Sequence, residues 1–334
     1  MDVALVAVQA ALDPGRYRSA ERYRGWIAEL AERAVDGLPD AAEVPRLLAF
    51  PELIGAPLAW LLDRPSDPRD VGQARHRVVE TVRGRPGAIV RAALRSRRIG
   101  PSLLLQTAAV RAGRIHAETF AQAARAAQAT VVAGTILGPP VAFEASRGWH
   151  VADPRPRARA STFAPDGSWI GVTDKVFLTP GAESRIGLSR GRIEDLRPLV
   201  TPAGLVGVAI CLDAFHDEAV ARLDGQGTRI LVQPSANLAD WSRPWPADPS
   251  LREGEAWWRY GLPRAVRGRP SLRYGVNPMM VGAALGLRPR GRSSIVGSGR
   301  AAEAGLPEGV LAAVGRDDAE GFARAVVPLD GASR

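Results

Sequence analysis

The stretch that decides the fold is VGVAICLDAFHDEAV, residues 206–220. Its apolar, β-branched start, Val206–Ile210, is typical of a buried strand, and the residues after it are typical of the start of a helix. A strand that runs directly into a helix is the building unit of α/β proteins. Cys211 stands at the junction, so we expect it above the sheet, beside the positive end of the helix, which would favour thiolate.

The same alternation extends along most of the chain. Other apolar runs bounded by turn residues predict strands, and apolar residues at helical spacing predict helices. The Pro165-Asp166-Gly167 turn predicts a hairpin between two of the strands. These elements indicate a layered α/β fold. The predicted strands are Val3–Gln9, Leu47–Phe50, Thr130–Ile136, Ala160–Ala164, Val206–Ile210, Arg229–Gln233, Tyr274–Val281 and Ala323–Leu329, and the helices are Ala20–Ala34, His116–Ala127 and His216–Leu223.

Two stretches break this alternation. Residues 57–100 are rich in Arg and Pro, with one helix-like piece at Gln73–Thr81, and residues 240–273 hold Trp241, Trp245, Trp257 and Trp258. A segment so rich in tryptophan is typical of a lid over a pocket or of an intersubunit contact. Plain core packing explains it equally well.

The charge of the chain is basic, with 44 Lys and Arg against 35 Asp and Glu and a net charge of +9. A basic balance raises nucleic acid as a partner. However, the one dense stretch, Arg83–Arg98, lacks zinc-finger spacing and an aromatic RNA-binding motif, so we expect no specific nucleic-acid function. No apolar run approaches the roughly 20 residues of a membrane helix. The apolar start Met1–Gln9 has no basic residue before it and is too short for a signal peptide, so we expect a buried strand and a cytoplasmic protein.

Two residue types occur once each. Lys175 is the only lysine among 44 basic residues, and Cys211 is the only cysteine. Arginine replaces lysine well at solvated positions, but not where a compact, titratable ammonium must fit a tight pocket. One cysteine excludes an internal disulfide and a multi-cysteine metal site. Both residues therefore become candidates for chemistry, beside the simpler interpretation of a surviving surface lysine and a buried core cysteine.

Glu52 occupies a position similar to that of Cys211. The run Leu47–Phe50 is an apolar strand that Pro51 terminates, because proline has no amide donor. A carboxylate just past a buried strand is partly desolvated, which raises its pKa toward that of a general base. Taken alone, Glu52 is more simply interpreted as a loop glutamate.

Other chemistries find less support. The histidines, His76, His116, His150 and His216, have no metal-ligand spacing. The chain has no Gly-x-Ser-x-Gly elbow, phosphate loop or dinucleotide fingerprint, so we expect no metal and no cofactor. A Cys211–His216 protease pairing is conceivable, but the two residues are only five apart.

Together these residues resemble the nitrilase superfamily of carbon–nitrogen hydrolases. The likeness runs from Val3 to about Val296, and its main motifs come in the family's order. They are Phe50-Pro51-Glu52, then Lys175 with Leu178-Thr179-Pro180 and Glu183, then Ile210-Cys211. Further similar segments are Val132–Ile136, Val232–Asn237, Asn277 with Gly282, and Gly291–Val296.

The resemblance implies a four-layer α-β-β-α sandwich that dimerises or assembles further. Residues 1–334 would form a single domain, with insertions at about 57–100 and 240–273. The resemblance also implies a catalytic triad of Glu52, Lys175 and Cys211, with Glu183 supporting the lysine and positioning substrate.

This triad implies a covalent mechanism. Glu52 takes the thiol proton, Cys211 attacks an amide or nitrile carbon, and Lys175 with the backbone N–H of Leu212 stabilises the negative charge. Nitrilases proper usually follow the cysteine with Trp-Glu, whereas this chain has Leu212-Asp213, which favours an amide, carbamoyl or ureido substrate. We expect Asp213 and His216 to lie close enough to the nucleophile to touch substrate. A nitrilase with the same triad and a non-catalytic binding member of the fold remain the alternatives.

Overall fold

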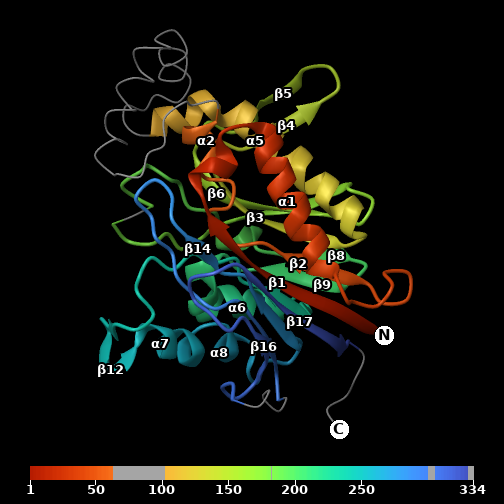
Figure 1. The fold of residues 1–334 in the computed structure, drawn as a ribbon, viewed down its shortest axis with the longest axis vertical. Helices are drawn as coiled ribbons and strands as arrows, with labels where there is room; N and C mark the ends of the chain where they lie inside the picture. Colours follow the sequence, from red (N-terminus) through yellow and green to blue (C-terminus); the bar gives the residue numbers. More distant parts are fainter. Residues whose placement is uncertain (63–101, 182, 300–304, 330–334) are drawn as a thin grey trace.

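The structure is a computed structural model that describes residues 1–62, 102–181, 183–299 and 305–329 (Figure 1). The Arg-rich stretch Arg83–Arg98, the helix-like piece Gln73–Thr81 and His76 lie outside the described residues.

The first sheet contains the strand that begins the chain. In the described ranges it has seven strands in the order β14-β1-β2-β3-β6-β7, with β17 also paired to β1. β1, β2 and β3 are parallel, and β6 and β7 form the antiparallel hairpin that the Pro-Asp-Gly turn predicts. The strands are β1 Asp2–Leu12, β2 Arg46–Ala49, β3 Thr130–Gly138, β6 Arg157–Phe163, β7 Trp169–Asp174, β14 Met280–Gly282 and β17 Gly321–Pro328.

The second sheet contains the strand that leads to Cys211. Its six strands, again counted over the described residues, follow the order β16-β15-β13-β10-β9-β8. β9, β10 and β13 are parallel. The strands are β8 Leu199–Thr201, β9 Gly204–Val208, β10 Ile230–Val232, β13 Tyr274–Asn277, β15 Ser294–Gly297 and β16 Val310–Ala313.

Helices and two small hairpins complete the fold. α1 Ala20–Val35, α2 Leu58–Leu61 and α5 Ser102–Ala127 lie beside the first sheet, and α6 Asp217–Asp224, α7 Glu253–Tyr260 and α8 Leu262–Val266 lie beside the second (Figure 1). The short 3-10 helices are η1 Pro14–Tyr17, η2 Ile193–Asp195 and η3 Cys211–Phe215. The hairpins pair β4 Val141–Glu144 with β5 Gly148–Val151 and β11 Pro244–Trp245 with β12 Asp248–Arg252.

Strand alternation produces the layers. In β1, Val3, Leu5 and Ala7 join the core between the two sheets, together with residues of β9 and β10, whereas Val6 and Val8 join the core under α1 and α5. On the far side, Leu231 and Val296 pack with apolar residues of α6 and α8. Three apolar cores thus separate four layers, so the predicted α-β-β-α sandwich is confirmed.

The structure contains strands that were not predicted, among them β4, β5, β8, β15 and β16, and three predicted stretches differ from it in other ways. The stretch Tyr274–Val281 is two strands, because the chain leaves the second sheet at Asn277, passes Pro278 and enters the first sheet at Met280. α5 begins at Ser102, well before the predicted start at His116. The tryptophan-rich stretch folds into β11, β12, α7 and α8, where Trp241 is buried against Trp258 and Trp257 packs on Phe215, so part of it is core packing.

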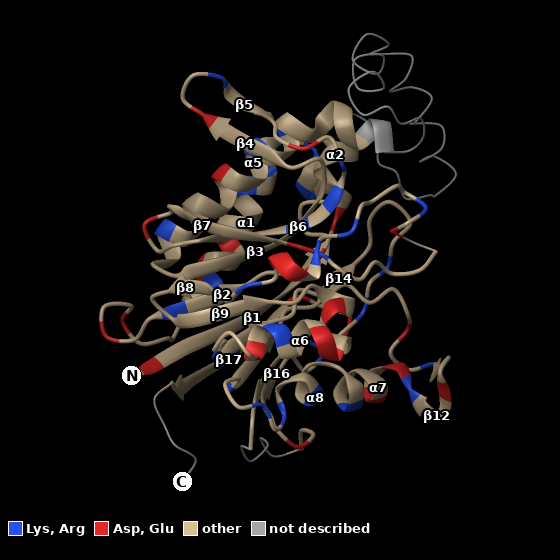
Figure 2. Ribbon diagram, turned by 180° about the vertical axis from the view of Figure 1, so that it is seen from behind, with Lys and Arg blue, Asp and Glu red and all other residues tan. Residues whose placement is uncertain are grey.

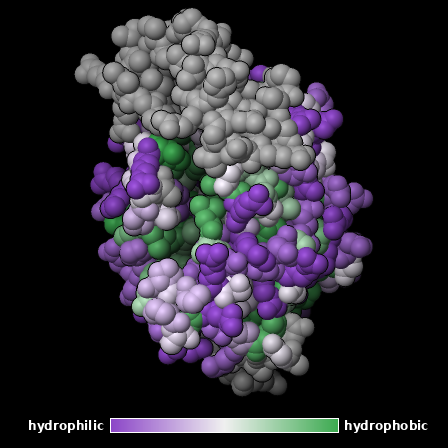
Figure 3. Space-filling view, turned by 60° about the vertical axis from the view of Figure 1, so that its left-hand side comes forward, coloured by the Kyte–Doolittle hydropathy of each residue, from purple (hydrophilic) through white to green (hydrophobic). Residues whose placement is uncertain are grey.

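Charged residues of both signs are visible on the side of the described chain that Figure 2 shows. Acidic and basic residues alternate over the helices and loops of the described chain in the view of Figure 2. The side at which β1 ends is hollowed and shows apolar residues between hydrophilic ones (Figure 3). β2 and β7 end beside Glu52 and Lys175, so this hollow side carries the loops of interest.

The loop that carries Glu52 depends on a glycine in β3. Gly134 has a φ of +63°, and a Cβ atom there would lie 2.1 Å from the carbonyl oxygen of Pro51. Gly148 has nearly the same φ, +66°, but a Cβ atom there would have no other atom within 4 Å. Alanine substitutions at Gly134 and Gly148 can therefore separate the effect of the left-handed backbone from that of a steric contact with Pro51.

We expect Gly134→Ala to destabilise the protein more than Gly148→Ala. Both substitutions place alanine in the left-handed region, which costs about 1–2 kcal/mol, and Gly134→Ala adds an overpacking cost of about 1–3 kcal/mol. Urea unfolding of the two variants measures the difference. Equal losses of unfolding free energy in the two variants would mean that the loop at Pro51 shifts to accept the extra methyl group at no measurable cost.

Candidate active site

Lys175 is a fully buried cation held by two carboxylates. It follows β7 directly and is 1% exposed. Its Nζ donates to Glu52 Oε1 at 2.7 Å and to Glu183 Oε1 at 2.9 Å. An ammonium has three N–H donors. Two are used here, and the third has no acceptor among the described residues.

The two carboxylates are themselves anchored. Glu52 is buried just past β2, and the next residue, Leu53, has a φ of +68° and donates its N–H to Thr135 Oγ1 at 2.9 Å. Glu183 accepts the N–H of Thr179 at 2.7 Å through its second oxygen. The two carboxylates that bind Lys175 are therefore positioned by hydrogen bonds that do not involve the lysine.

Cys211 lies at the first position of η3 with an unusual backbone. Its φ is +49°, a left-handed conformation that costs a non-glycine residue about 1–2 kcal/mol. Its N–H donates to Pro234 O at 2.9 Å, and its carbonyl accepts from Gln233 Nε2 at 2.8 Å. Strained backbone of this kind persists where the surroundings hold a residue for function.

The thiol belongs to the same polar cluster. Glu52 and Lys175 both interact electrostatically with the sulfur, and the backbone N–H of Ala236 lies beside it. The structure thus brings Glu52, Lys175 and Cys211 together, although they are distant in sequence.

The electrostatics of the cluster favour a protonated thiol at rest. Burial, and then the charge of Glu52, raise the pKa of Cys211. The expectation that a helix terminus would favour thiolate is wrong, because η3 is a five-residue 3-10 turn and the sulfur is buried beside a carboxylate. Burial also raises the pKa of Glu52, and Glu183 adds to this effect against the opposing charge of Lys175.

Lys175 remains charged in this setting. Burial alone would lower its pKa, but the charges of Glu52, Cys211 and Glu183 outweigh burial and raise it. The cluster holds two carboxylates against one ammonium, so a further proton is readily accepted. A raised glutamate pKa beside a neutral thiol suits proton transfer from sulfur to carboxylate.

The other predicted residues have different surroundings. The backbone N–H of Leu212 has no hydrogen-bond acceptor in the part of the chain that the structure describes. Asp213 is fully buried and accepts three backbone N–H groups, so its expected contact with substrate is wrong. The ring of His216 stacks on Phe177, with 3.7 Å between centroids and 9° between planes.

Sequence reasoning missed Gln233 and the N–H of Ala236 as parts of this site. Both lie in the segment Val232–Asn237, where the sequence offers only a general likeness to the family. Gln233 is fully buried, and its Oε1 has no partner among the described residues. The signal that could have indicated Gln233 is an uncharged polar side chain directly after an apolar strand.

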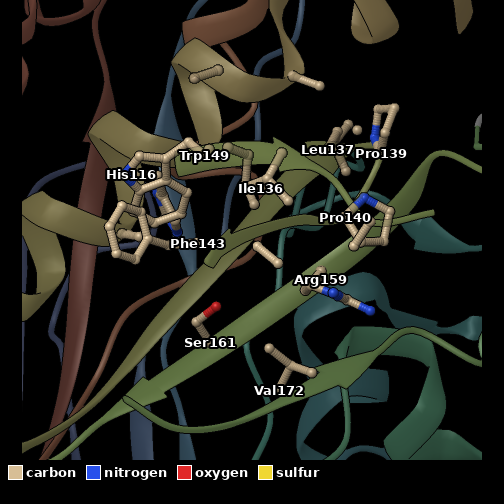
Figure 4. A pocket seen from close by; sticks show the side chains of 18 of the residues that line it. His116, Ile136, Leu137, Pro139, Pro140, Phe143, Trp149, Arg159, Ser161 and Val172 are labelled. Atoms are coloured by element: carbon tan, nitrogen blue, oxygen red, sulfur yellow. The ribbon is translucent and has the colours of Figure 1, made fainter. Parts of the chain in front are cut away.

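A mostly apolar cavity lies elsewhere in the described part of the chain. It measures about 440 Å³ and lies between α5, the β4–β5 hairpin and the outer face of β6 and β7 (Figure 4). His116, Trp149, Ser161 and Val172 are among its mostly apolar lining residues. It includes none of the Glu52 cluster, so it is not the place of the chemistry above.

Comparison with known proteins returns one family model, carbon–nitrogen hydrolase, which matches residues 4–309. Comparison with curated protein sequences returns no match. None of the helices in the described ranges is long and apolar enough to cross a bilayer.

Solved structures share the fold over nearly the whole chain. A carbon–nitrogen hydrolase from Helicobacter pylori G27 has a TM-score of 0.64 and 17% identity, covering 98% of this chain and 90% of that one. An amidase from Nesterenkonia sp. has a TM-score of 0.56 and 18% identity, with coverages of 99% and 91%. A nitrilase-superfamily member from Saccharomyces cerevisiae has a TM-score of 0.56 and 16% identity, with coverages of 97% and 89%.

We expect Lys175→Met to destabilise the protein by about 3–5 kcal/mol at pH 7, because two buried carboxylates lose their cation. Their pKa values would rise further, so the uncompensated cluster would bind protons in the folded state. A carboxyl group whose pKa is higher in the folded state than in the unfolded state stabilises the folded protein at low pH. This contribution is lost as the pH rises through the folded-state pKa. The loss should therefore be smaller at pH 5 than at pH 8.

Urea unfolding at several pH values measures this dependence. Arg192→Met is the control, because it removes one partner of an exposed ion pair with Glu194, and we expect no measurable change. A loss for Lys175→Met that is the same at pH 5 and pH 8 would contradict the electrostatic account.

Proposed function

Because this chain belongs to the carbon–nitrogen hydrolase family, we propose that it hydrolyses small amides or carbamoyl compounds through a thioester on Cys211. The observation that carries the proposal is the buried cluster in which Lys175 donates to Glu52 and Glu183 and both Glu52 and Lys175 interact electrostatically with the Cys211 thiol. No cofactor is needed for this chemistry.

In the first half of the reaction, Glu52 accepts the proton of the thiol as the sulfur forms a bond to the carbonyl carbon. The negative charge that develops on the oxygen is stabilised by the third N–H of Lys175 and the free N–H of Leu212. Glu52 returns the proton to the departing nitrogen, the carbon–nitrogen bond breaks, and ammonia or an amine leaves. A thioester remains on Cys211.

In the second half, Glu52 takes a proton from water as the oxygen attacks the thioester carbon. The carbon–sulfur bond breaks, the acid leaves, and the proton returns to the sulfur. Lys175 stays charged throughout, because its pKa is held up by the two glutamates. Glu183 supports the lysine and anchors its loop through Thr179.

The solved relatives lend support from outside the chain. A mutant of the Nesterenkonia amidase carries acrylamide added to its active-site cysteine. Leu212-Asp213 after the cysteine favours an amide over a nitrile here. The predicted homo-oligomer, the single domain with two insertions and the cytoplasmic location stay predictions.

We expect the wild type to release ammonia from at least one of a panel of small amides and carbamoyl amino acids. Cys211→Ala should abolish release, and Glu52→Gln should lower kcat by about 10²- to 10⁴-fold. Glu253→Gln is the matched control, since Glu253 is a buried glutamate that accepts from Trp257 Nε1. Release that survives in Cys211→Ala would exclude the thioester, and acid formed only from nitriles would indicate a nitrilase.

We also expect activity to fall in acid at a higher pH than a free glutamate would cause. Glu52 must be ionised to accept the thiol proton, and burial raises its pKa above the ordinary value of 4.5. The acid limb of kcat/KM on a responding amide measures this. An apparent pKa of this acid limb at or below 4.5 would mean that Glu52 is not the essential base.

A further inference from the structure

Asp213 is a buried carboxylate that the reaction scheme does not use. It is 0% exposed and lies two residues after Cys211. Oδ1 accepts the N–H groups of Val176 at 3.1 Å and Phe177 at 2.7 Å, and Oδ2 accepts that of Ile210 at 3.2 Å. Both oxygens are therefore occupied by backbone donors.

These donors flank the two reactive side chains. Val176 follows Lys175, and Ile210 precedes Cys211. Lys175 follows β7 of the first sheet, whereas Cys211 follows β9 of the second. One carboxylate thus ties together two loops that extend from different sheets.

A second contact joins the same two loops. The ring of Phe177, next to Val176, stacks on His216, whose N–H donates to the carbonyl of Asp213 at 3.2 Å. Burial raises the pKa of the Asp213 carboxyl group, and the charge of Lys175 is among the interactions that oppose this rise. Asp213 is therefore at the centre of the contact between the lysine loop and the cysteine turn.

We propose that Asp213 is a positioning residue that holds the Cys211 turn against the Lys175 loop, so that thiol and ammonium keep their reactive separation. The proposal rests on the proposed function for its effect on turnover. A displacement of about 1 Å between reacting groups can lower a rate about 10²-fold.

A carboxylate suits this role better than the isosteric amide. Asparagine would offer one oxygen and place an NH₂ donor against the remaining backbone N–H, so either the lysine loop or Ile210 would lose its acceptor. Keeping the charge buried is unfavourable: burial raises the pKa of Asp213 to about 7, although the N–H groups of Phe177 and Val176 oppose this. A carboxyl group at this buried position therefore fits a requirement for two acceptor oxygens.

The test compares Asp213→Asn with Asp224→Asn. Asp224 is also buried, and its Oδ1 accepts the N–H groups of Ser271 and Leu272, but it contacts neither reactive loop. Two rates are measured: kcat and KM on a responding amide, and alkylation of Cys211 by iodoacetamide at pH 7. Because Cys211 is the only cysteine, alkylation reports on this thiol alone.

We expect Asp213→Asn to lower kcat about 10- to 100-fold with little change in KM, and to slow alkylation, because the Lys175 charge that lowers the thiol pKa moves away. Asp224→Asn should lower the melting temperature but keep both rates. The sign of the alkylation change is decisive: loss of the negative charge alone would favour thiolate and make alkylation faster. Unchanged or faster alkylation, or equal effects of the two variants, would overturn the proposal.

The two proposals fail in distinguishable ways. If the wild type hydrolyses no amide while alkylation slows in Asp213→Asn, the positioning role stands and the proposed function falls. If Asp213→Asn does not fold, Asp213→Glu keeps the charge and shifts the carboxylate by one methylene. Its alkylation should then be slower than in the wild type, and a wild-type rate would overturn the positioning role.

Discussion

The structure depends on a single buried cation. An isolated ammonium in a protein interior costs several kcal/mol, and so does each isolated carboxylate. Lys175 with Glu52 and Glu183 avoids most of that cost, since each carboxylate lies within 3 Å of Nζ. Burial raises the pKa of Glu52, with a further contribution from the charge of Glu183, and burial together with the charge of Glu52 keeps the neighbouring thiol protonated. Two carboxylates beside one ammonium make this cluster unfavourable to bury, and the same excess of negative charge favours the transfer of a proton to Glu52. A bulkier, planar arginine would not fit the compact site between Glu52 and Glu183, which explains why one lysine remains among so many arginines.

Packing of the two sheets against each other assembles this cluster. Glu52 and Lys175 follow strands of one sheet and Cys211 follows a strand of the other, so the reactive side chains meet only when the two sheets pack. The core between the sheets, built from residues such as Leu5, Leu47, Val208 and Val232, therefore contributes to the geometry of the site as well as to stability. Gly134 and the buried Asp213 refine the fit of the loops, the first by allowing the Glu52 loop to approach β3 and the second by joining the lysine and cysteine loops.

The layered fold could be predicted because apolar runs at strand and helix spacing are visible in a sequence. Lys175 and Cys211 stood out as the single residues of their types, whereas Glu52 joined them only through the resemblance to the family, and the catalytic roles of the three stay predictions. Burial depth is not visible in a sequence, so the helix expected after Cys211 led to the wrong direction for the thiol pKa. Asp213 was expected to touch substrate because it lies two residues from the nucleophile. Its partners are instead backbone N–H groups, which leave no trace in the side-chain pattern. The run Tyr274–Val281 was predicted as one strand, since both halves are apolar and nothing local says that they enter different sheets. Gln233 was overlooked for the same reason: its partner is the carbonyl of Cys211.

The most direct test of the central claim is the mass of the protein during turnover. The wild type would be mixed with a responding amide, quenched in acid, and its peptides mapped by mass spectrometry. The account predicts an acyl group, with the mass of the substrate less its amine, on Cys211, and a smaller fraction of adduct in Lys175→Met, where the charge on the attacked oxygen loses its cation. Steady release of ammonia with no adduct on Cys211, or with an adduct on another residue, would contradict it.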